Sequence, residues 1–124
     1  MSLHAIVFID HEHAKIFHLD GIHASGAELK QHAHHHSHSA KHKVDGKVQH
    51  DTKLFEATAQ ALQSAKEILL VGPGLAKTEF MHFVEQRAKQ LQSKIVAVEA
   101  VDHPTDAQLI ALAKKRFKTI DMWR

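Results

Sequence analysis

The segment at residues 31–50, QHAHHHSHSAKHKVDGKVQH, constrains the possible folds of this chain more than any other feature. It holds half of the 14 histidines of the chain and contains no Leu, Ile, Phe, Trp or Tyr. A segment of this composition cannot bury an apolar face, so we expect it to be a long exposed loop. Short strand-like apolar runs precede it, and longer helix-like patterns follow it. The segment therefore predicts an α/β scaffold that presents a histidine-rich loop.

Apolar runs before this segment predict a β-hairpin and one further strand. Residues 4–9 are continuously apolar and include β-branched side chains, which is typical of a strand covered on both faces. Residues 14–19 predict a second strand, and the short polar link between the two runs indicates a hairpin. Asp20-Gly21 is a turn signal. A weaker pattern at residues 27–31 predicts an edge strand that leads into the loop.

Helical and strand-like patterns alternate after the segment. The expected elements are a helix that begins after Asp51, a strand at residues 67–71, a helix through residues 80–91, a strand at residues 94–98 and a helix that opens at Pro104 and Thr105. Asp51 is a suitable N-cap, and Thr105 with Gln108 has the spacing of a capping box. Gly72-Pro73-Gly74 cannot continue a strand ladder, so we expect a tight turn there. This order predicts one α/β domain over residues 1–124, with a mixed five-stranded sheet and three helices.

The composition limits the classes of function. The chain has no cysteine, which excludes thiolate metal sites and suits the cytoplasm. We expect no signal peptide and no membrane span, because the start lacks a basic segment and no apolar run reaches ~20 residues. The formal charge is only +2, but the region from Lys30 to His50 carries four lysines against one acid, Asp45. The basic patch therefore lies in the histidine-rich segment.

Residues 48–88 resemble the central domain of the Pelota and archaeo-eukaryotic class-1 release factor superfamily. VQHDTKLFEATAQAL is similar to the helix that follows the exposed loop of that domain. ILLVGPGLAKTEFMHFVEQRA is similar to its strand, Gly/Pro turn and helix, and AIVFIDHEHAKIFHLDG is similar to its paired opening strands. The resemblance covers almost the whole chain. It implies an RNase H-like fold and a role on the ribosome, as for a small bacterial relative built around this one domain.

The chain departs from that family in the functional loop. Release factors carry Gly-Gly-Gln there and use it in the hydrolysis of peptidyl-tRNA, whereas this sequence reads AKHKVDGKVQHD, with only Gly46 and Gln49. Pelota-type factors lack the triplet and use a basic loop to contact tRNA or rRNA. The resemblance therefore implies a translation-associated protein without peptide release. Flanking domains that read the A site and recruit a GTPase are absent from this sequence, so we expect it to differ from a complete rescue factor.

Ribosome or structured-RNA binding is the first hypothesis for the histidine-rich segment. Lysine side chains can neutralise phosphates, and the segment has no aromatic ring on which a base could stack. Contact with the phosphate backbone is therefore favoured over sequence readout. The predicted RNA-binding residues are Lys41, His42, Lys43, Lys47 and Gln49.

Two other hypotheses remain open, and both involve a metal. In an extended segment His34, His36 and His38 would point to one side, and in a helical one His34, His38 and His42 would align. Imidazoles placed in either way suit Zn²⁺, Ni²⁺ or Cu²⁺. Asp10 ends the first strand, where an RNase H-like nuclease would place a metal-binding carboxylate. Catalysis by two metal ions would need further acids at that place. The candidates by chain order are Glu56, Glu67 and Asp102.

Two further expectations concern neighbouring features. Gly72-Pro73-Gly74 with Lys77-Thr78 is similar to a phosphate loop, but its spacing differs, so a turn before a helix is favoured. An edge strand beside a long loop could also pair two subunits in a homodimer.

Overall fold

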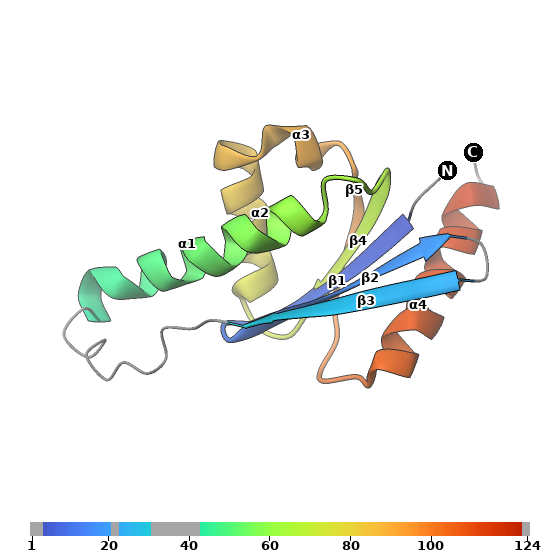
Figure 1. The fold of residues 1–124 in the computed structure, drawn as a ribbon, viewed down its shortest axis with the longest axis horizontal. Helices are drawn as coiled ribbons and strands as arrows, with labels where there is room; N and C mark the ends of the chain where they lie inside the picture. The colour runs from blue at the N-terminus through green and yellow to red at the C-terminus, as the bar shows by residue number, and fades with distance from the viewer. Residues whose placement is uncertain (1–3, 21–22, 31–42, 123–124) are drawn as a thin grey trace.

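Five strands form one sheet, in the spatial order β3-β2-β1-β4-β5. The computed structural model describes residues 4–20, 23–30 and 43–122 (Figure 1). The elements in chain order are β1 (His4–Ile9), β2 (His13–Asp20), β3 (His23–Lys30), α1 (Lys43–Ala61), β4 (Glu67–Gly72), α2 (Ala76–Arg87), α3 (Lys89–Gln92), β5 (Ile95–Ala100) and α4 (Asp106–Met122). β1, β2 and β3 are antiparallel neighbours, whereas β4 runs parallel to both β1 and β5. The mixed five-stranded sheet and an edge strand before the histidine-rich segment are confirmed, although β3 begins at His23 and not at residue 27.

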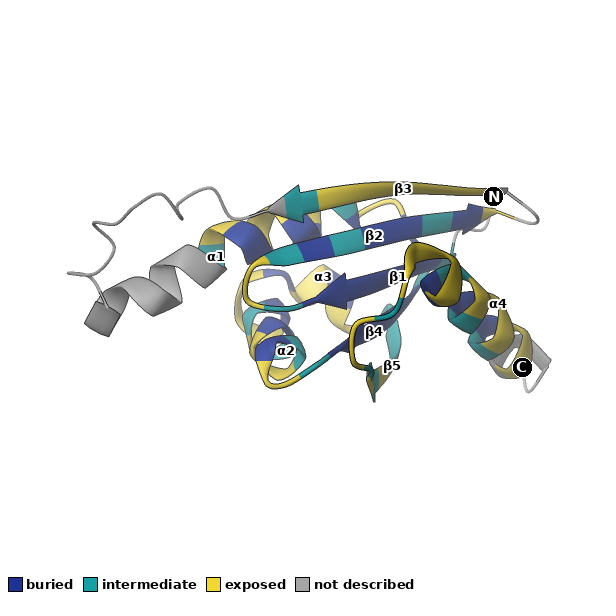
Figure 2. Ribbon diagram, turned by 90° about the horizontal axis from the view of Figure 1, so that it is seen from below, coloured by how far each residue is buried: buried dark blue, intermediate teal, exposed yellow. Residues whose placement is uncertain are grey.

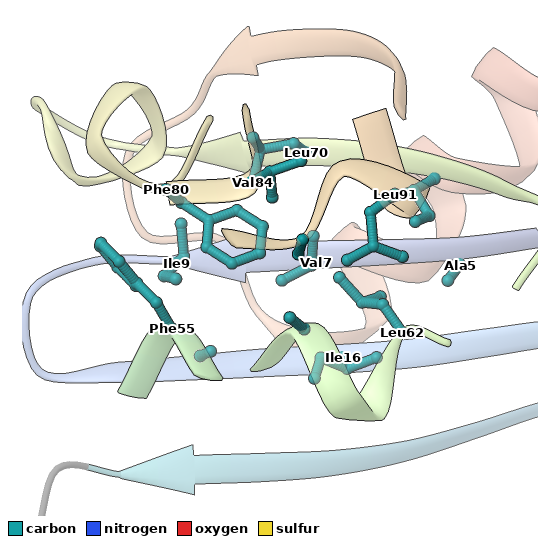
Figure 3. Close-up of a cluster of buried hydrophobic side chains, with 14 of the residues drawn as sticks. Ala5, Val7, Ile9, Ile16, Phe55, Leu62, Leu70, Phe80, Val84 and Leu91 are labelled. Carbon is teal, nitrogen blue, oxygen red and sulfur yellow. The ribbon is translucent and has the colours of Figure 1, made fainter. Parts of the chain in front are cut away.

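The neighbouring strands β1 and β4 are buried on both faces because helices cover the sheet from both sides (Figure 2). On one face, α1, α2 and α3 pack against alternate residues of β1, such as Val7 and Ile9 (Figure 3). On the other face, Ile6 and Phe8 of β1 pack against α4. The α4 residues in this second core are Leu109, Ala113 and Phe117. The continuous apolar pattern of β1 thus supplies two separate cores. No helix of the described residues is long and apolar enough to span a bilayer.

Helix α1 begins earlier than the sequence analysis predicts. It starts at Lys43, so Asp51 lies inside the helix and the prediction of an N-cap there is wrong. Extension of a helix adds a hydrogen bond for each residue that becomes fixed, while only the first turn is costly. Intrinsic propensity does not explain this extension, because residues 43–50 include Gly46 and other poor helix formers. The second part of the histidine-rich segment is therefore helical and does not belong to a loop.

The pattern at residues 80–91 predicts one helix, but the structure contains two. α2 ends at Arg87, and Ala88 leaves the helical conformation with φ −144° and ψ 54°. Ala88 and Leu91 are both buried in the core beneath α2. After the short α3, the carbonyl of Lys94 accepts a hydrogen bond from the Ile68 amide at 2.8 Å. The break thus directs the chain towards the start of β4, and neither glycine nor proline marks it in the sequence.

The predicted capping box at the start of α4 is confirmed. The Gln108 amide donates to Thr105 Oγ1 at 3.1 Å, and the Thr105 amide donates to Gln108 Oε1 at 2.9 Å. Farther along the helix, Arg116 binds the carboxylate of Glu99 on β5 with two nitrogens. This contact raises the pKa of Arg116, through hydrogen bonding and through the charge of Glu99. α4 is therefore fixed at its first turn and along its length.

The edge strand β3 carries small exposed side chains and pairs with β2 along its whole length. Gly26 lies under the ring of Phe17, where an added Cβ would approach the ring carbon Cε1 to 2.3 Å. A glycine covered by an aromatic ring on the neighbouring strand is a known way to keep such a position packed. A homodimer formed through this edge stays a prediction.

Candidate functional site

The carboxyl ends of β1, β4 and β5 meet at one edge of the sheet, because these strands are parallel. Ligands of open α/β sheets commonly bind outside this edge. The turn at residues 10–13, the turn at residues 72–75 and the link at residues 101–105 all lie there (Figure 1). Lys30, the last residue of β3, pairs with His13 at the same edge. The histidine-rich segment, which follows Lys30 in sequence, therefore leaves the sheet beside this carboxyl edge.

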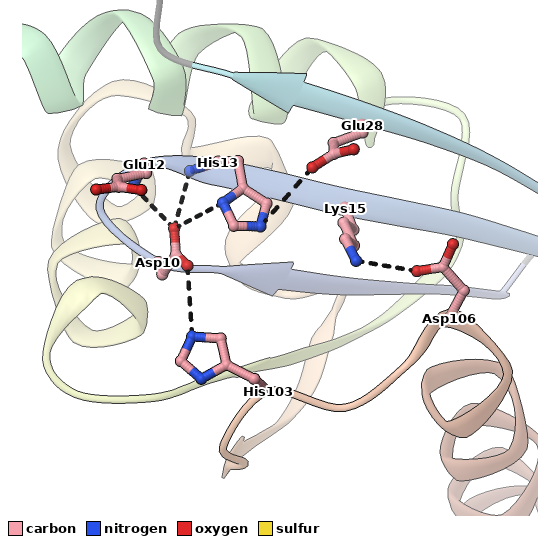
Figure 4. A network of polar contacts seen from close by, with 7 residues as sticks. All are labelled: Asp10, Glu12, His13, Lys15, Glu28, His103 and Asp106. Carbon is pink, nitrogen blue, oxygen red and sulfur yellow. Dashed lines mark hydrogen bonds and ion pairs between the residues drawn. The ribbon is translucent and has the colours of Figure 1, made fainter. Parts of the chain in front are cut away.

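Asp10 closes the turn between β1 and β2. Its Oδ1 accepts hydrogen bonds from the backbone amides of Glu12 and His13, both at 2.8 Å (Figure 4). Aspartate commonly stabilises turns in this way. The carboxylate that the sequence analysis considered as a metal ligand thus has a structural role in the hairpin.

Two histidines lie on either side of the Asp10 carboxylate (Figure 4). His13 Nδ1 is 3.2 Å from Asp10 Oδ1, and its Nε2 is 3.7 Å from Glu28 Oε2 on β3. His103 Nε2 is 3.9 Å from Asp10 Oδ2, and its Nδ1 is 3.1 Å from Asp102 Oδ1. The cluster therefore brings two imidazoles and three carboxylates together at this end of the sheet.

Further contacts join this cluster and the β1–β2 hairpin to the helices α2 and α4. The ring of Phe8 packs against both imidazoles, with centroids 6.0 Å from His13 and 5.9 Å from His103. Lys15 Nζ donates to Asp106 Oδ1 at 3.0 Å, and His11 Nε2 lies 3.1 Å from Glu79 Oε1. The β1–β2 hairpin is thus bound to the first turns of both α4 and α2.

The turn at Gly72-Pro73-Gly74 does not present a free phosphate-binding lysine. Lys77 Nζ donates to the carbonyl of Gly74 at 2.7 Å and so turns back on its own loop. Gly74 has φ 59°, which glycine adopts without strain. The structure therefore supports the interpretation as a tight turn before a helix.

Comparison with known proteins supports the fold. No protein-family model and no curated protein matches the sequence. Among solved structures, Archaeoglobus fulgidus Pelota matches with a TM-score of 0.62 and 19% identity, over 92% of this chain and 31% of that chain. The archaeal termination factor aRF1 matches with a TM-score of 0.63 and 19% identity, over 86% of this chain and 32% of that chain. The chain has a Pelota and release-factor domain fold.

A second Pelota structure agrees. The Thermoplasma acidophilum protein matches with a TM-score of 0.59 and 17% identity, over 88% of this chain and 30% of that chain. The chain thus spans about a third of the length of these solved structures. The resemblance that the sequence analysis draws to a Pelota-like domain is therefore confirmed for the fold.

The structure describes only part of the predicted RNA-binding and metal-binding set. Three of these residues, Lys43, Lys47 and Gln49, lie in the first two turns of α1 of the Pelota-like fold. The other five fall outside the described residues. These are His34, His36, His38, Lys41 and His42.

Of the acids proposed for a nuclease, Asp102 lies close to Asp10 through His103, but Glu56 and Glu67 do not join them. Glu67 lies at the opposite end of the sheet from Asp10, 3.1 Å from His4 Nε2. Glu56 on α1 pairs with Arg87 on α2 at 3.2 Å. Within the described residues, no group of three His, Asp or Glu side chains could hold a metal ion. The geometry around Asp10 therefore does not favour metal-dependent cleavage.

Sequence reasoning missed His103 as a partner of Asp10. The available signal was the topology: Asp102-His103 follows a predicted parallel strand, so it belongs at the same edge as the end of β1. The contact of His11 with Glu79 had no such signal, because it joins a turn to the exposed face of a helix.

Proposed function

We propose that this protein is translation-associated and binds the ribosome, tRNA or rRNA through its basic histidine-rich segment. The Pelota and release-factor domain fold is the observation that carries the proposal. The role would be in ribosome rescue or the response to stalled ribosomes. Of these solved structures, aRF1 is named as an archaeal translation termination factor.

The charge of the segment supports contact with phosphates. Lys41, Lys43 and Lys47 lie within a short distance in sequence, and the only acid among them is Asp45. Each lysine that neutralises a phosphate releases counterions, which favours binding to any nucleic-acid backbone. At mildly acid pH the histidines of the segment itself would add to this positive charge.

The segment also lacks the residues for peptide release. It contains Gly46 and Gln49 but no Gly-Gly-Gln. Lys47 and Gln49 lie in the helical backbone of α1, and a regular helix does not offer the extended loop that such a triplet would occupy. The proposed activity is therefore binding without hydrolysis of peptidyl-tRNA.

Co-sedimentation with ribosomes tests this proposal. We expect a variant with Lys41, Lys43 and Lys47 all changed to Ala to bind roughly tenfold more weakly. The slope of log K against log salt concentration should also become less steep by about two to three, because three phosphate contacts are lost. Alanine is a stronger helix former than lysine, so the start of α1 should persist. The matched control changes three exposed lysines elsewhere to Ala, namely Lys53, Lys66 and Lys89. Equal pelleting of the variant and the wild type would remove the segment from the mechanism.

Metal binding by the histidine-rich segment is the second candidate. The observation that favours it is the position of the segment, which leaves the sheet beside His13 and its neighbour His103. For this candidate, calorimetry with Zn²⁺ or Ni²⁺ at neutral pH should give micromolar or tighter binding with a fixed stoichiometry. A variant with His34, His36 and His38 changed to Ala should lose it. Millimolar affinity, or a stoichiometry that varies between preparations, would contradict a dedicated site.

A further inference from the structure

Strand β5 is the outermost strand on its side of the sheet, and no strand lies beyond it in the described part of the chain. Its hydrogen bonds to β4 show which backbone groups the outer edge offers. The Val101 amide donates to the Gly72 carbonyl, and Gly72 lies opposite Ala100. Successive residues of a strand point their backbone groups to opposite sides, so Glu99 also bonds towards β4. The N–H and C=O groups of Val98 and Ala100 therefore face away from β4.

β5 also lacks the side chains that usually protect an edge strand. Edge strands commonly carry lysine, proline or an inward-pointing charge, which keeps other strands from adding to them. The sequence of β5 is IVAVEA, with no lysine and no proline. Its one charged side chain, Glu99, is held by two nitrogens of Arg116 on α4. The irregularity in its pairing with β4 lies before Ala97, so the second half of the strand forms a regular ladder that is open to another strand.

The side chains beside this edge are apolar and partly uncovered. Val98 is 45% exposed and is one of two large apolar residues that are exposed in the described part of the chain. Ala100 is exposed as well. Leu70, which lies opposite Val98 on β4, is by contrast fully buried in the core with α2. The helices thus cover β4 but leave the outer strand open, and a strand added there would bury Val98 (Figure 2).

We propose that β5 pairs with β5 of a second copy of this chain, antiparallel and centred on Val98, so that two five-stranded sheets join into one. A two-fold axis beside Val98 makes the contact self-complementary, because both copies present the same groups. Val98 then lies opposite Val98 of the second copy, and its amide and carbonyl both bond across the axis. Val96 of each copy lies opposite Ala100 of the other, so apolar positions meet along the join.

The charges at the two ends of β5 favour a second copy over an unrelated peptide. Lys94 directly precedes the strand, and Asp102 follows shortly after its end. The two residues are equally far in sequence from Val98, so antiparallel pairing brings Lys94 of each copy to Asp102 of the other. Asp102 is 96% exposed and lies beside His103, while Lys94 Nζ donates to the uncharged carbonyl of Gln63. Two ion pairs, one on each side of the axis, would therefore stabilise the dimer.

This inference does not rest on the proposed function, because β5 lies at the opposite edge of the sheet from β3 and the histidine-rich segment. Each can fail alone.

Analytical ultracentrifugation of the full chain over a range of concentrations tests the proposal. We expect a reversible monomer–dimer equilibrium, since pairing of two short strands buries less than a standard interface of about 1,600 Å². Val98→Lys places two like charges beside the axis and should weaken the dimer by about a hundredfold or more. Ala27→Lys is the matched control, because it puts the same charge at an exposed position of the other edge strand, β3. A chain that stays monomeric up to millimolar concentration, or a dimer that is lost with Ala27→Lys and kept with Val98→Lys, would overturn the proposal.

A charge swap tests the register and leaves Val98 in place. Lys94→Glu alone, or Asp102→Lys alone, puts like charges close together on both sides of the axis and should weaken the dimer about tenfold. The double variant restores opposite charges and should return the affinity to within about threefold of the wild type. The two positions are about 27 Å apart along one strand, so no contact within a single copy can give this rescue. Losses that simply add in the double variant would contradict the proposed pairing.

Discussion

Replacement of Gly72 by alanine is expected to lower the free energy of unfolding by about 3 kcal/mol or more. Gly72 is the last residue of β4, and a Cβ added there would lie 2.2 Å from the carbonyl oxygen of Ile9 on β1. Because the obstacle is backbone, no side-chain rotation can relieve it, and the two central strands must move apart. The Val101 amide also donates to the Gly72 carbonyl, so such a movement would disturb β5 as well. Urea titration of both proteins measures the loss.

Gly74 provides a matched control for this prediction. An added Cβ at Gly74 would meet nothing within 4 Å, but the residue has φ 59°. Alanine there should cost only about 1 kcal/mol, which is the usual penalty for a side chain in the left-handed region. A larger loss for Gly74→Ala than for Gly72→Ala would show that turn conformation, and not the contact between β1 and β4, limits stability at this edge.

Replacement of Phe80 by alanine is expected to cost about 4 kcal/mol. Its side chain is fully buried in the core between the sheet and the helices α1 and α2 (Figure 3). The ring of Phe55 on α1 meets it edge-on with centroids 5.4 Å apart, and Phe83 stacks on it at 6.2 Å. The loss therefore combines a cavity with the loss of contact between two helices. Chemical denaturation followed by circular dichroism gives the value.

Two further variants test the cause of that loss. Phe80→Leu keeps most of the volume and should cost no more than about 1.5 kcal/mol. Phe83 is only partly buried, with its ring beneath the guanidinium of Arg87, so Phe83→Ala should cost about 1–2 kcal/mol. If Phe80→Ala and Phe83→Ala lowered the free energy of unfolding by similar amounts, the core would have to relax into the space left by Phe80. The burial of Phe80 would then not determine its contribution to stability.

Much of the fold follows from local pattern. The apolar run of β1, the spacing of Thr105 and Gln108, and the alternation of strands and helices predict elements that the structure contains. The start of α1 and the break at Ala88 were not predictable in this way. The start of α1 depends on the low cost of extending an existing helix, and the break depends on packing beneath α2. Neither effect leaves a residue signature.

Less of the candidate site could be predicted from the sequence. Asp10 was identified, but its hydrogen bonds to the turn and its contact with His103 depend on geometry between distant segments. The ring contact between His4 and Phe117 was missed altogether. These two residues stand near opposite ends of the chain, and each has an ordinary role in its own element. Only the crossing of α4 over the start of β1 brings them together.

The pairing of β3 with β2 has a mechanical consequence for any protein held by its histidine-rich segment. A force applied at Lys30 along the strand axis would load this pairing. Antiparallel ladder bonds are perpendicular to that axis, so the load is shared across the register from His13–Lys30 to Asp20–His23 and does not break one bond at a time. The pairing of β3 with β2 would therefore resist a shear force applied through Lys30.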